Sequence, residues 1–119
     1  MNYFKPEEFH CRCGCSEQSI EPELEDMLNI ARHFAEIPFI VTSGYRCPEH
    51  NKKIQGVKNS PHLKGIAVDL SADTSRERWL IVSSLIRAGF KRIGIGEDFI
   101  HTDIGNVPDK VSELIWLYD

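Results

Sequence analysis

The sequence has no apolar run that approaches the roughly 20 residues of a membrane-spanning helix. It also has no excess of basic residues, because 14 Lys and Arg stand against 18 Asp and Glu, for a net charge of −4. Nucleic acid is therefore not the expected partner, since phosphate binding usually shows as a basic face. The first residues lack the basic and apolar regions of a signal peptide. We therefore expect a protein without a membrane span that is cytoplasmic as synthesised and reaches an outside target only after release.

Internal repeats, low-complexity stretches and linker-like segments are also absent from the sequence. At 119 residues, of which 41% are hydrophobic and 27% charged, the chain has the size and composition of one ordinary globular domain. We therefore expect residues 1–119 to form a single domain, and we expect that domain to act as a monomer.

The spacing of apolar residues predicts two helices and several short strands. This order, with short links among the last strands, favours an α+β fold with a mainly antiparallel sheet and helices packed on one side. The segment 43–65 is rich in Gly, Pro, Asn, Ser and Lys and is expected to be a long, partly helical loop, of the kind that is often functional. Trp79 and Trp116 lie in apolar stretches and are expected in the core. The predicted helices span residues 22–36 and 75–88, and the predicted strands span residues 39–42, 66–71, 92–96, 99–104 and 113–118.

Two segments contain three residues of the types that bind metals. Residues 60–69 read Ser-Pro-His-Leu-Lys-Gly-Ile-Ala-Val-Asp and residues 99–103 read Phe-Ile-His-Thr-Asp, in a chain with only five histidines. His62, Asp69 and His101 would suit Zn²⁺ and would leave a fourth tetrahedral position open, which is typical of a catalytic rather than a structural zinc. A water molecule in that position can become a nucleophile near neutral pH. The pattern therefore indicates a small metal-dependent hydrolase.

The alternation of side chains along the strands is compatible with such a site. If Ile66, Val68 and Leu70 face the core, Asp69 points to the opposite face. If Ile100 and Ile104 face the core, His101 and Asp103 do the same. Asp69 and His101 can then project from one side of one sheet, with His62 in the loop just before. Asp103 either orients a ligand from behind or is an exposed residue at the strand end, and the sequence leaves both interpretations open.

These segments, together with Thr42-Ser-Gly-Tyr-Arg46, resemble the zinc D-Ala-D-Ala carboxypeptidases. They are similar also to the peptidoglycan L-Ala-D-Glu endopeptidases, which include phage endolysins, and both groups have the hedgehog/DD-peptidase fold. The shared motifs span about residues 39 to 105. The resemblance implies zinc ligands at His62, Asp69 and His101. It also implies a catalytic carboxylate three residues before the last ligand, which is Asp98, and an arginine that contacts the substrate and the developing oxyanion, which is Arg46.

Peptide hydrolysis needs a group that takes a proton from the attacking water and delivers it to the leaving amine, and a carboxylate can do both. Glu97 is an alternative to Asp98, because the start of the strand is uncertain by a residue or two. Arg46 offers a planar, permanently charged group for the tetrahedral oxyanion or for a substrate carboxylate.

The predicted function is therefore that of a zinc metallopeptidase that hydrolyses peptidoglycan stem peptides of the bacterial cell wall. It would use a metal-activated water and a carboxylate general base, and would act either as a D-Ala-D-Ala carboxypeptidase or as an L-Ala-D-Glu endopeptidase. The alternative is a non-catalytic, zinc-containing, cell-wall-binding module of the same fold. Asp98 and Arg46 favour the enzyme, because a binding module has no need of them.

The four cysteines allow three interpretations. Cys11, Cys13 and Cys15 lie close together in Cys-Arg-Cys-Gly-Cys, and Cys47 directly follows Arg46. They could bind a second, structural Zn²⁺, with His10 as a substitute for one of them, although their spacing is tighter than the usual Cys-x-x-Cys pairs. They could instead form one or two disulfides, or remain free thiols without a role. A crosslink of either kind would hold the loop that carries Arg46.

Overall fold

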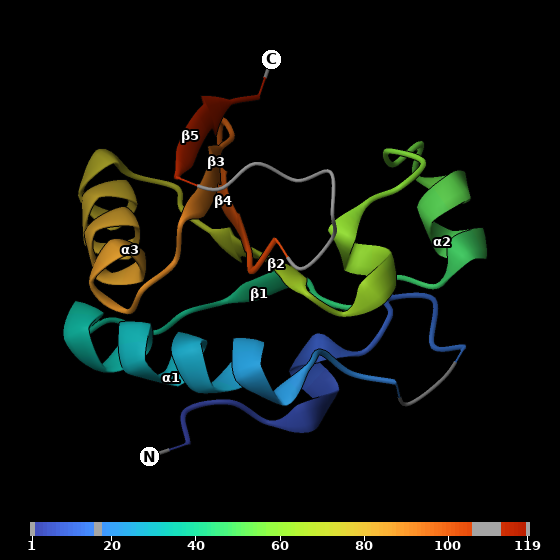
Figure 1. Cartoon of the computed structure of the whole chain (residues 1–119), viewed down its shortest axis with the longest axis horizontal. Helices are drawn as coiled ribbons and strands as arrows, with labels where there is room; N and C mark the ends of the chain where they lie inside the picture. Colours follow the sequence, from blue (N-terminus) through green and yellow to red (C-terminus); the bar gives the residue numbers. More distant parts are fainter. Residues whose placement is uncertain (1, 16–17, 106–112, 119) are drawn as a thin grey trace.

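The computed structural model describes residues 2–15, 18–105 and 113–118, and within them a five-stranded sheet forms the centre (Figure 1). The strand order is β1-β2-β4-β3-β5. Neighbouring strands are antiparallel except β3 and β5, which are parallel. This confirms the expected α+β fold with a mainly antiparallel sheet. The strands are β1 (Val41–Ser43), β2 (Ala67–Ser71), β3 (Arg92–Ile95), β4 (Phe99–Asp103) and β5 (Leu114–Leu117).

The first long helix, α1 (Pro22–Ala35), is formed by residues that suit each of its ends. Pro22 occupies the first helical turn, where its missing N–H costs no hydrogen bond. Acidic residues in the first turn and basic residues in the last turn complement the helix dipole. Glu36 ends the helix in the left-handed conformation, with φ of 57°. The buried face of α1 consists of Leu24, Leu28, Asn29, Ala31 and Ala35.

The second long helix, α3 (Ser75–Arg87), begins with a capping box. The Thr74 hydroxyl accepts a hydrogen bond from the Glu77 N–H at 3.1 Å, and the Glu77 carboxylate accepts one from the Thr74 N–H at 3.2 Å. The buried face consists of Ile81, Ser84 and Leu85. Trp79 lies outside this face and is 70% exposed, so its expected place in the core is wrong.

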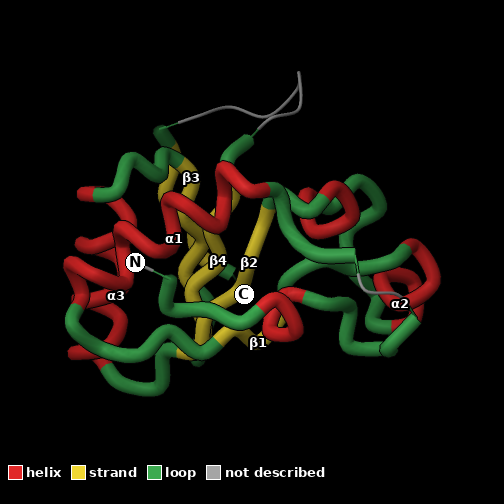
Figure 2. The backbone as a smooth tube through the Cα atoms, turned by 90° about the horizontal axis from the view of Figure 1, so that it is seen from below, coloured by secondary structure: helices red, strands yellow, loops and turns green. Residues whose placement is uncertain are grey.

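One face of the sheet forms the hydrophobic core and the other is left for polar side chains. Val68, Leu70 and Ile100 are completely buried and pack in one cluster with residues of α1 and α3. Figure 2 shows α3 on one side of the strands and the short helix α2 (Pro48–Lys53) on the other, with α1 overlapping the strands in this view. The predicted inward face of β2 is therefore confirmed, and Asp69 and His101 point away from α1 and α3.

None of the helices in the described part of the chain has the length and the apolar character needed to cross a bilayer.

The packing of the core predicts that substitutions at two positions of α1 differ sharply in their effect on the free energy of unfolding. Leu28 is fully buried, whereas Ile30 is 41% exposed. Leu28→Ala should lower the free energy of unfolding by about 2–5 kcal/mol, because it removes buried methyl groups and leaves a cavity. The matched control Ile30→Ala should change it by about 0.5 kcal/mol or less. Urea unfolding followed by circular dichroism measures both, and equal effects would contradict the packing described for α1.

Candidate metal centre

The pairing of β2 with β4 brings two of the three predicted ligands together. Asp69 lies directly opposite His101 in this antiparallel pair, and side chains opposite each other on one face are in contact distance. The Nδ1 atom of His101 lies 2.9 Å from Oδ1 of Asp69. His101 is buried, and Asp69 is partly exposed.

His62 reaches the same point from the loop before β2. It lies in a short 3₁₀ helix, η2 (Pro61–Lys64), whose N-cap Ser60 accepts a hydrogen bond from the His62 N–H at 3.2 Å. The Nε2 atom of His62 lies 3.3 Å from Oδ1 of Asp69. One possible ligand atom from each of His62, Asp69 and His101 therefore lies within 4.8 Å of the others. The structure thus brings together the three residues that the sequence motif singles out.

Each histidine is oriented by a hydrogen bond on the side away from Asp69. Nδ1–H of His62 donates to the carbonyl oxygen of Gly44 at 2.7 Å, and Nε2–H of His101 donates to Oδ2 of Asp103 at 2.8 Å. Such bonds to a backbone carbonyl or a carboxylate are typical of metal-binding histidines, because they select the tautomer and hold the ring in place. They leave Nε2 of His62 and Nδ1 of His101 as the atoms directed at the common centre.

These atoms fit a cation. The Nε2 atom of His62 is buried and forms no hydrogen bond within the described structure. Two imidazole nitrogens and a carboxylate oxygen thus converge as acceptors, and this donor set is one that Zn²⁺ binds. Burial acts to raise the pKa of Asp69, but the neighbouring imidazoles of His101 and His62 outweigh this effect and hold the pKa well below its usual range. The carboxylate is therefore ionised, as a metal ligand must be.

Asp103 is a buried residue that orients His101, and it is not an exposed residue at the strand end. The first of the two interpretations that the sequence leaves open is therefore correct. The Asp103 side chain is only 1% exposed, and its second oxygen accepts a hydrogen bond from Nε of Arg92 at 2.7 Å. Burial acts to raise the pKa of Asp103, but the contacts with His101 and Arg92 lower it. A chain of hydrogen bonds therefore runs from Arg92 through Asp103 to His101 and ends at the proposed metal position. Arg92 was not foreseen, because nothing in its local sequence separates it from a surface arginine.

Aromatic rings lie against the other side of His101. The ring centroid of Trp116 lies 5.6 Å from that of His101, and the centroid of Tyr118 lies 6.2 Å away. This approach depends on Gly94, which pairs with His101 on one side and Trp116 on the other. A Cβ atom at position 94 would lie 2.5 Å from the Tyr118 ring and 2.7 Å from the Trp116 indole nitrogen. Trp116 is only partly buried and packs against His101, so its expected place in the hydrophobic core is wrong.

Arg46 is held beside the centre by three separate contacts. Its Nε donates to the Ser43 hydroxyl at 3.1 Å, NH1 donates to Oδ1 of Asn51 at 3.2 Å, and NH2 lies 3.4 Å from Oδ2 of Asp69. Burial lowers its pKa, while the nearby charge of Asp69 acts in the opposite direction. Asn51 is itself buried and was not foreseen, although it stands five residues after Arg46 in a helix whose other residues are more exposed.

A polar pocket of about 360 Å³ opens beside this group. Asp69, Arg46 and Asp98 all line it, and Asp98 is exposed. Glu97, the alternative carboxylate, is not among the lining residues, and its backbone carbonyl accepts a hydrogen bond from Arg78 at 3.1 Å.

A sequence profile described as Peptidase M15 matches residues 2–103. The chain belongs to the peptidase M15 family.

This membership confirms the resemblance that the motifs of residues 42–46, 60–69 and 99–103 indicate. M15 peptidases are zinc-dependent metallopeptidases, and the paired histidines and Asp69 of this M15 chain supply a donor set of the matching kind. No curated protein matches the sequence.

The bond between His101 and Asp103 can be tested separately from the metal ligands. Asp103→Ala should weaken zinc binding about 10- to 100-fold, because His101 loses the carboxylate that fixes its tautomer and orientation. Competition with a chromophoric chelator measures the affinity, with the zinc released counted per chain. Arg92→Met is the matched control, since it removes the same ion pair but leaves the His101–Asp103 bond, and its effect should be smaller. Unchanged affinity in Asp103→Ala would mean that strand pairing alone orients His101.

Proposed function

We propose that this M15 peptidase binds Zn²⁺ at His62, Asp69 and His101 and hydrolyses peptidoglycan stem peptides. The bond cut is either the terminal D-Ala-D-Ala bond or the L-Ala-D-Glu bond. The observation that carries the proposal is the convergence of two oriented histidines and an ionised Asp69 at the edge of a pocket that also holds Arg46 and Asp98.

When bound there, Zn²⁺ supplies a Lewis acid that polarises a carbonyl group and lowers the pKa of a water molecule. The chain itself has to hold the substrate, move a proton and stabilise the charge that develops on the carbonyl oxygen. Asp98 can move the proton with its carboxylate, and Arg46 can stabilise the developing charge with its guanidinium.

Asp98 is proposed as the general base and acid. Its carboxylate receives no hydrogen bond from the residues that the structure describes, and it faces the same pocket as Asp69. It can therefore accept a proton from the attacking water and deliver it to the amine that leaves. Its backbone is fixed, because its carbonyl oxygen accepts a hydrogen bond from the Ala72 N–H at 2.9 Å. The pocket lining supports Asp98 rather than Glu97 in this role.

Arg46 is proposed to bind the oxyanion or a carboxylate of the substrate. Its guanidinium is already fixed by Ser43, Asn51 and Asp69, so little conformational freedom is lost when it binds a substrate. Both candidate bonds suit such a cation. The residue that leaves is D-Ala in one case and γ-linked D-Glu in the other, and each carries a free α-carboxylate next to the bond that is cut. This shared feature explains why one arginine would serve either reaction.

Replacement of Asp98 should separate catalysis from metal binding. Asp98→Asn should lower kcat about 10²- to 10⁴-fold, because it removes the proton acceptor. The zinc content should not change, since Asp98 is not one of the proposed ligands. Glu97→Gln is the matched control and should retain nearly full activity. A reversed result, with loss of activity only in Glu97→Gln, would transfer the role of the base to Glu97.

The substrate is tested by mass spectrometry of the stem pentapeptide L-Ala-γ-D-Glu-Lys-D-Ala-D-Ala after incubation with the zinc-loaded protein, with intact cross-linked wall in parallel. A product shorter by one C-terminal alanine identifies a carboxypeptidase, and release at the L-Ala-D-Glu bond identifies an endopeptidase. His62→Ala, which lacks one proposed ligand, controls for contaminating peptidases. If the zinc-loaded protein cuts neither substrate but sediments with the wall, it is a binding module of the same fold.

A further inference from the structure

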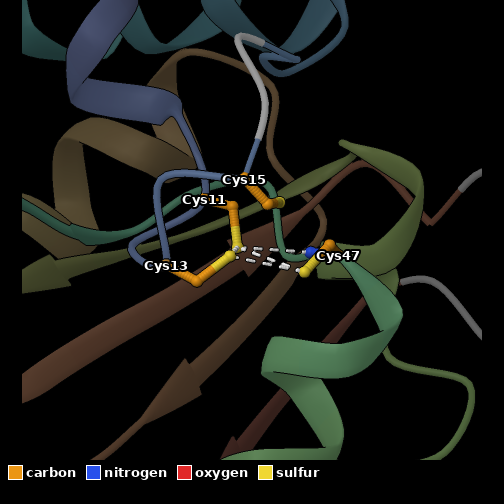
Figure 3. A group of neighbouring side chains, drawn as sticks. All are labelled: Cys11, Cys13, Cys15 and Cys47. Atoms are coloured by element: carbon orange, nitrogen blue, oxygen red, sulfur yellow. Dashed lines mark hydrogen bonds between the residues drawn. The ribbon is translucent and has the colours of Figure 1, made fainter.

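Four cysteines from two segments that are distant in the sequence come together beside Arg12 and Arg46, two of the residues that line the pocket. Cys11, Cys13 and Cys15 lie in the loop that follows the short 3₁₀ helix η1 (Pro6–Phe9), and Cys47 caps helix α2. Figure 3 shows the three residues of the loop on one side of the group and Cys47 on the other, with Cys11 and Cys13 pointing toward Cys47. No disulfide joins any two of these four residues, and their sulfur atoms lie within 4.8 Å of one another. Neither the proposed peptidase site nor its oriented histidines includes them.

The distances between the sulfur atoms match a tetrahedral metal site. They are 3.4 Å from Cys11 to Cys13, 3.7 Å from Cys11 to Cys47 and 3.5 Å from Cys13 to Cys47. Four sulfur atoms placed tetrahedrally around an ion at about 2.3 Å would be about 3.8 Å apart. A disulfide would need about 2.05 Å between two of them. Three sulfur atoms at nearly equal distances from one another are the arrangement expected around one ion, whereas disulfides would divide the four into pairs.

The surrounding backbone is suited to negatively charged sulfur. The Cys47 N–H donates to the Cys11 sulfur at 3.4 Å, and the His50 N–H donates to the Cys47 sulfur at 3.3 Å. Hydrogen bonds of this kind around metal ligands fix their orientation and stabilise their charge. Gly14 makes the tight return of the loop possible, with φ of +73° and a hydrogen bond from its N–H to the Cys11 carbonyl at 3.0 Å. Cys13 and Cys15 can thereby reach the same centre although only one residue separates them.

We propose that Cys11, Cys13, Cys15 and Cys47 bind a second Zn²⁺, which is structural. Four thiolates form a closed site without a free position for water, which is typical of structural zinc. Soft sulfur ligands also select zinc over the harder divalent ions. A chain of 119 residues has a small core, and an ion that ties residues 11–15 to residue 47 would contribute directly to folding.

This second ion would also organise the catalytic pocket, an extension that rests on the proposed function. Arg12 stands between two of the ligands, donates hydrogen bonds to the carbonyls of Val41 and Thr42, and lines the pocket. Arg46 immediately precedes the fourth ligand, Cys47, and lines the same pocket. The thiolate site therefore holds the backbone of both pocket arginines, which come from segments more than 30 residues apart.

The test counts metal ions and identifies their ligands in the full chain purified under reducing conditions. We expect two zinc ions per chain in the wild type, measured by elemental analysis. The double variant C13S/C47S should hold one, and the matched double variant H62A/H101A should also hold one. After replacement of zinc by Co²⁺, the intense thiolate-to-cobalt absorption should be present in the wild type and in H62A/H101A but absent in C13S/C47S.

A measurement on the wild type avoids any failure of the cysteine variant to fold. A mercurial reagent that modifies thiols should release one zinc ion per chain and leave the second, which a strong chelator then removes. One zinc ion per chain together with four thiols that react freely in the native protein would overturn the proposal. A mass lowered by two hydrogen atoms per bridge in the native protein would also overturn it in favour of disulfides. These results do not depend on peptidase activity, so the second site can stand even where no substrate is cut.

Discussion

The antiparallel register between β2 and β4 is the constraint on which the rest of the site depends. It pairs Leu70 with Ile100 toward the helices and Asp69 with His101 toward the pocket. Because successive side chains of a strand alternate between faces, a slip of one residue in either strand would turn the metal-binding candidate of that strand into the core and expose its apolar residues. Burial of Val68, Leu70 and Ile100 therefore stabilises the fold and fixes the ligand geometry at the same time.

A second constraint follows from the burial of charged groups around His101. Asp103 is almost completely buried, and an unpaired carboxylate there would be strongly destabilising. Arg92 and His101 together satisfy it. The cost of burying these groups is offset only when all of them are present in one arrangement. This explains why the network, more than any single hydrogen bond, gives His101 one defined orientation toward Asp69.

The sequence allowed the β-strand faces and the three converging residues to be predicted because both follow from short-range patterns. Alternation along residues 66–71 and 99–104 determines which side chains share a face, and strand pairing then brings them together. The roles of Arg92 and Trp116 depend on contacts with other strands, which no local pattern reveals. Asn51 contacts Arg46 only five residues earlier, but in a loop whose fold no simple periodicity describes. Trp79 shows the same limit in a helix. Its apolar surroundings in the sequence placed Trp79 in the core, whereas α3 buries Ile81 and the small Ser84 and leaves Trp79 largely exposed.

The long connection between β1 and β2 carries the groups that strand pairing cannot position. It contains Arg46, Cys47 and His62, and regular sheet hydrogen bonds hold none of them. Instead, the Tyr45 N–H donates to the Phe9 carbonyl at 2.9 Å and the Arg46 N–H donates to the His62 carbonyl at 3.0 Å. Loops that carry functional groups need such support from a rigid scaffold. The N-terminal segment supplies this support through Phe9 and Arg12. A metal ion bound by the cysteines would add metal–sulfur bonds between this segment and the loop. A small domain can in this way keep a long functional loop in one conformation without a larger hydrophobic core.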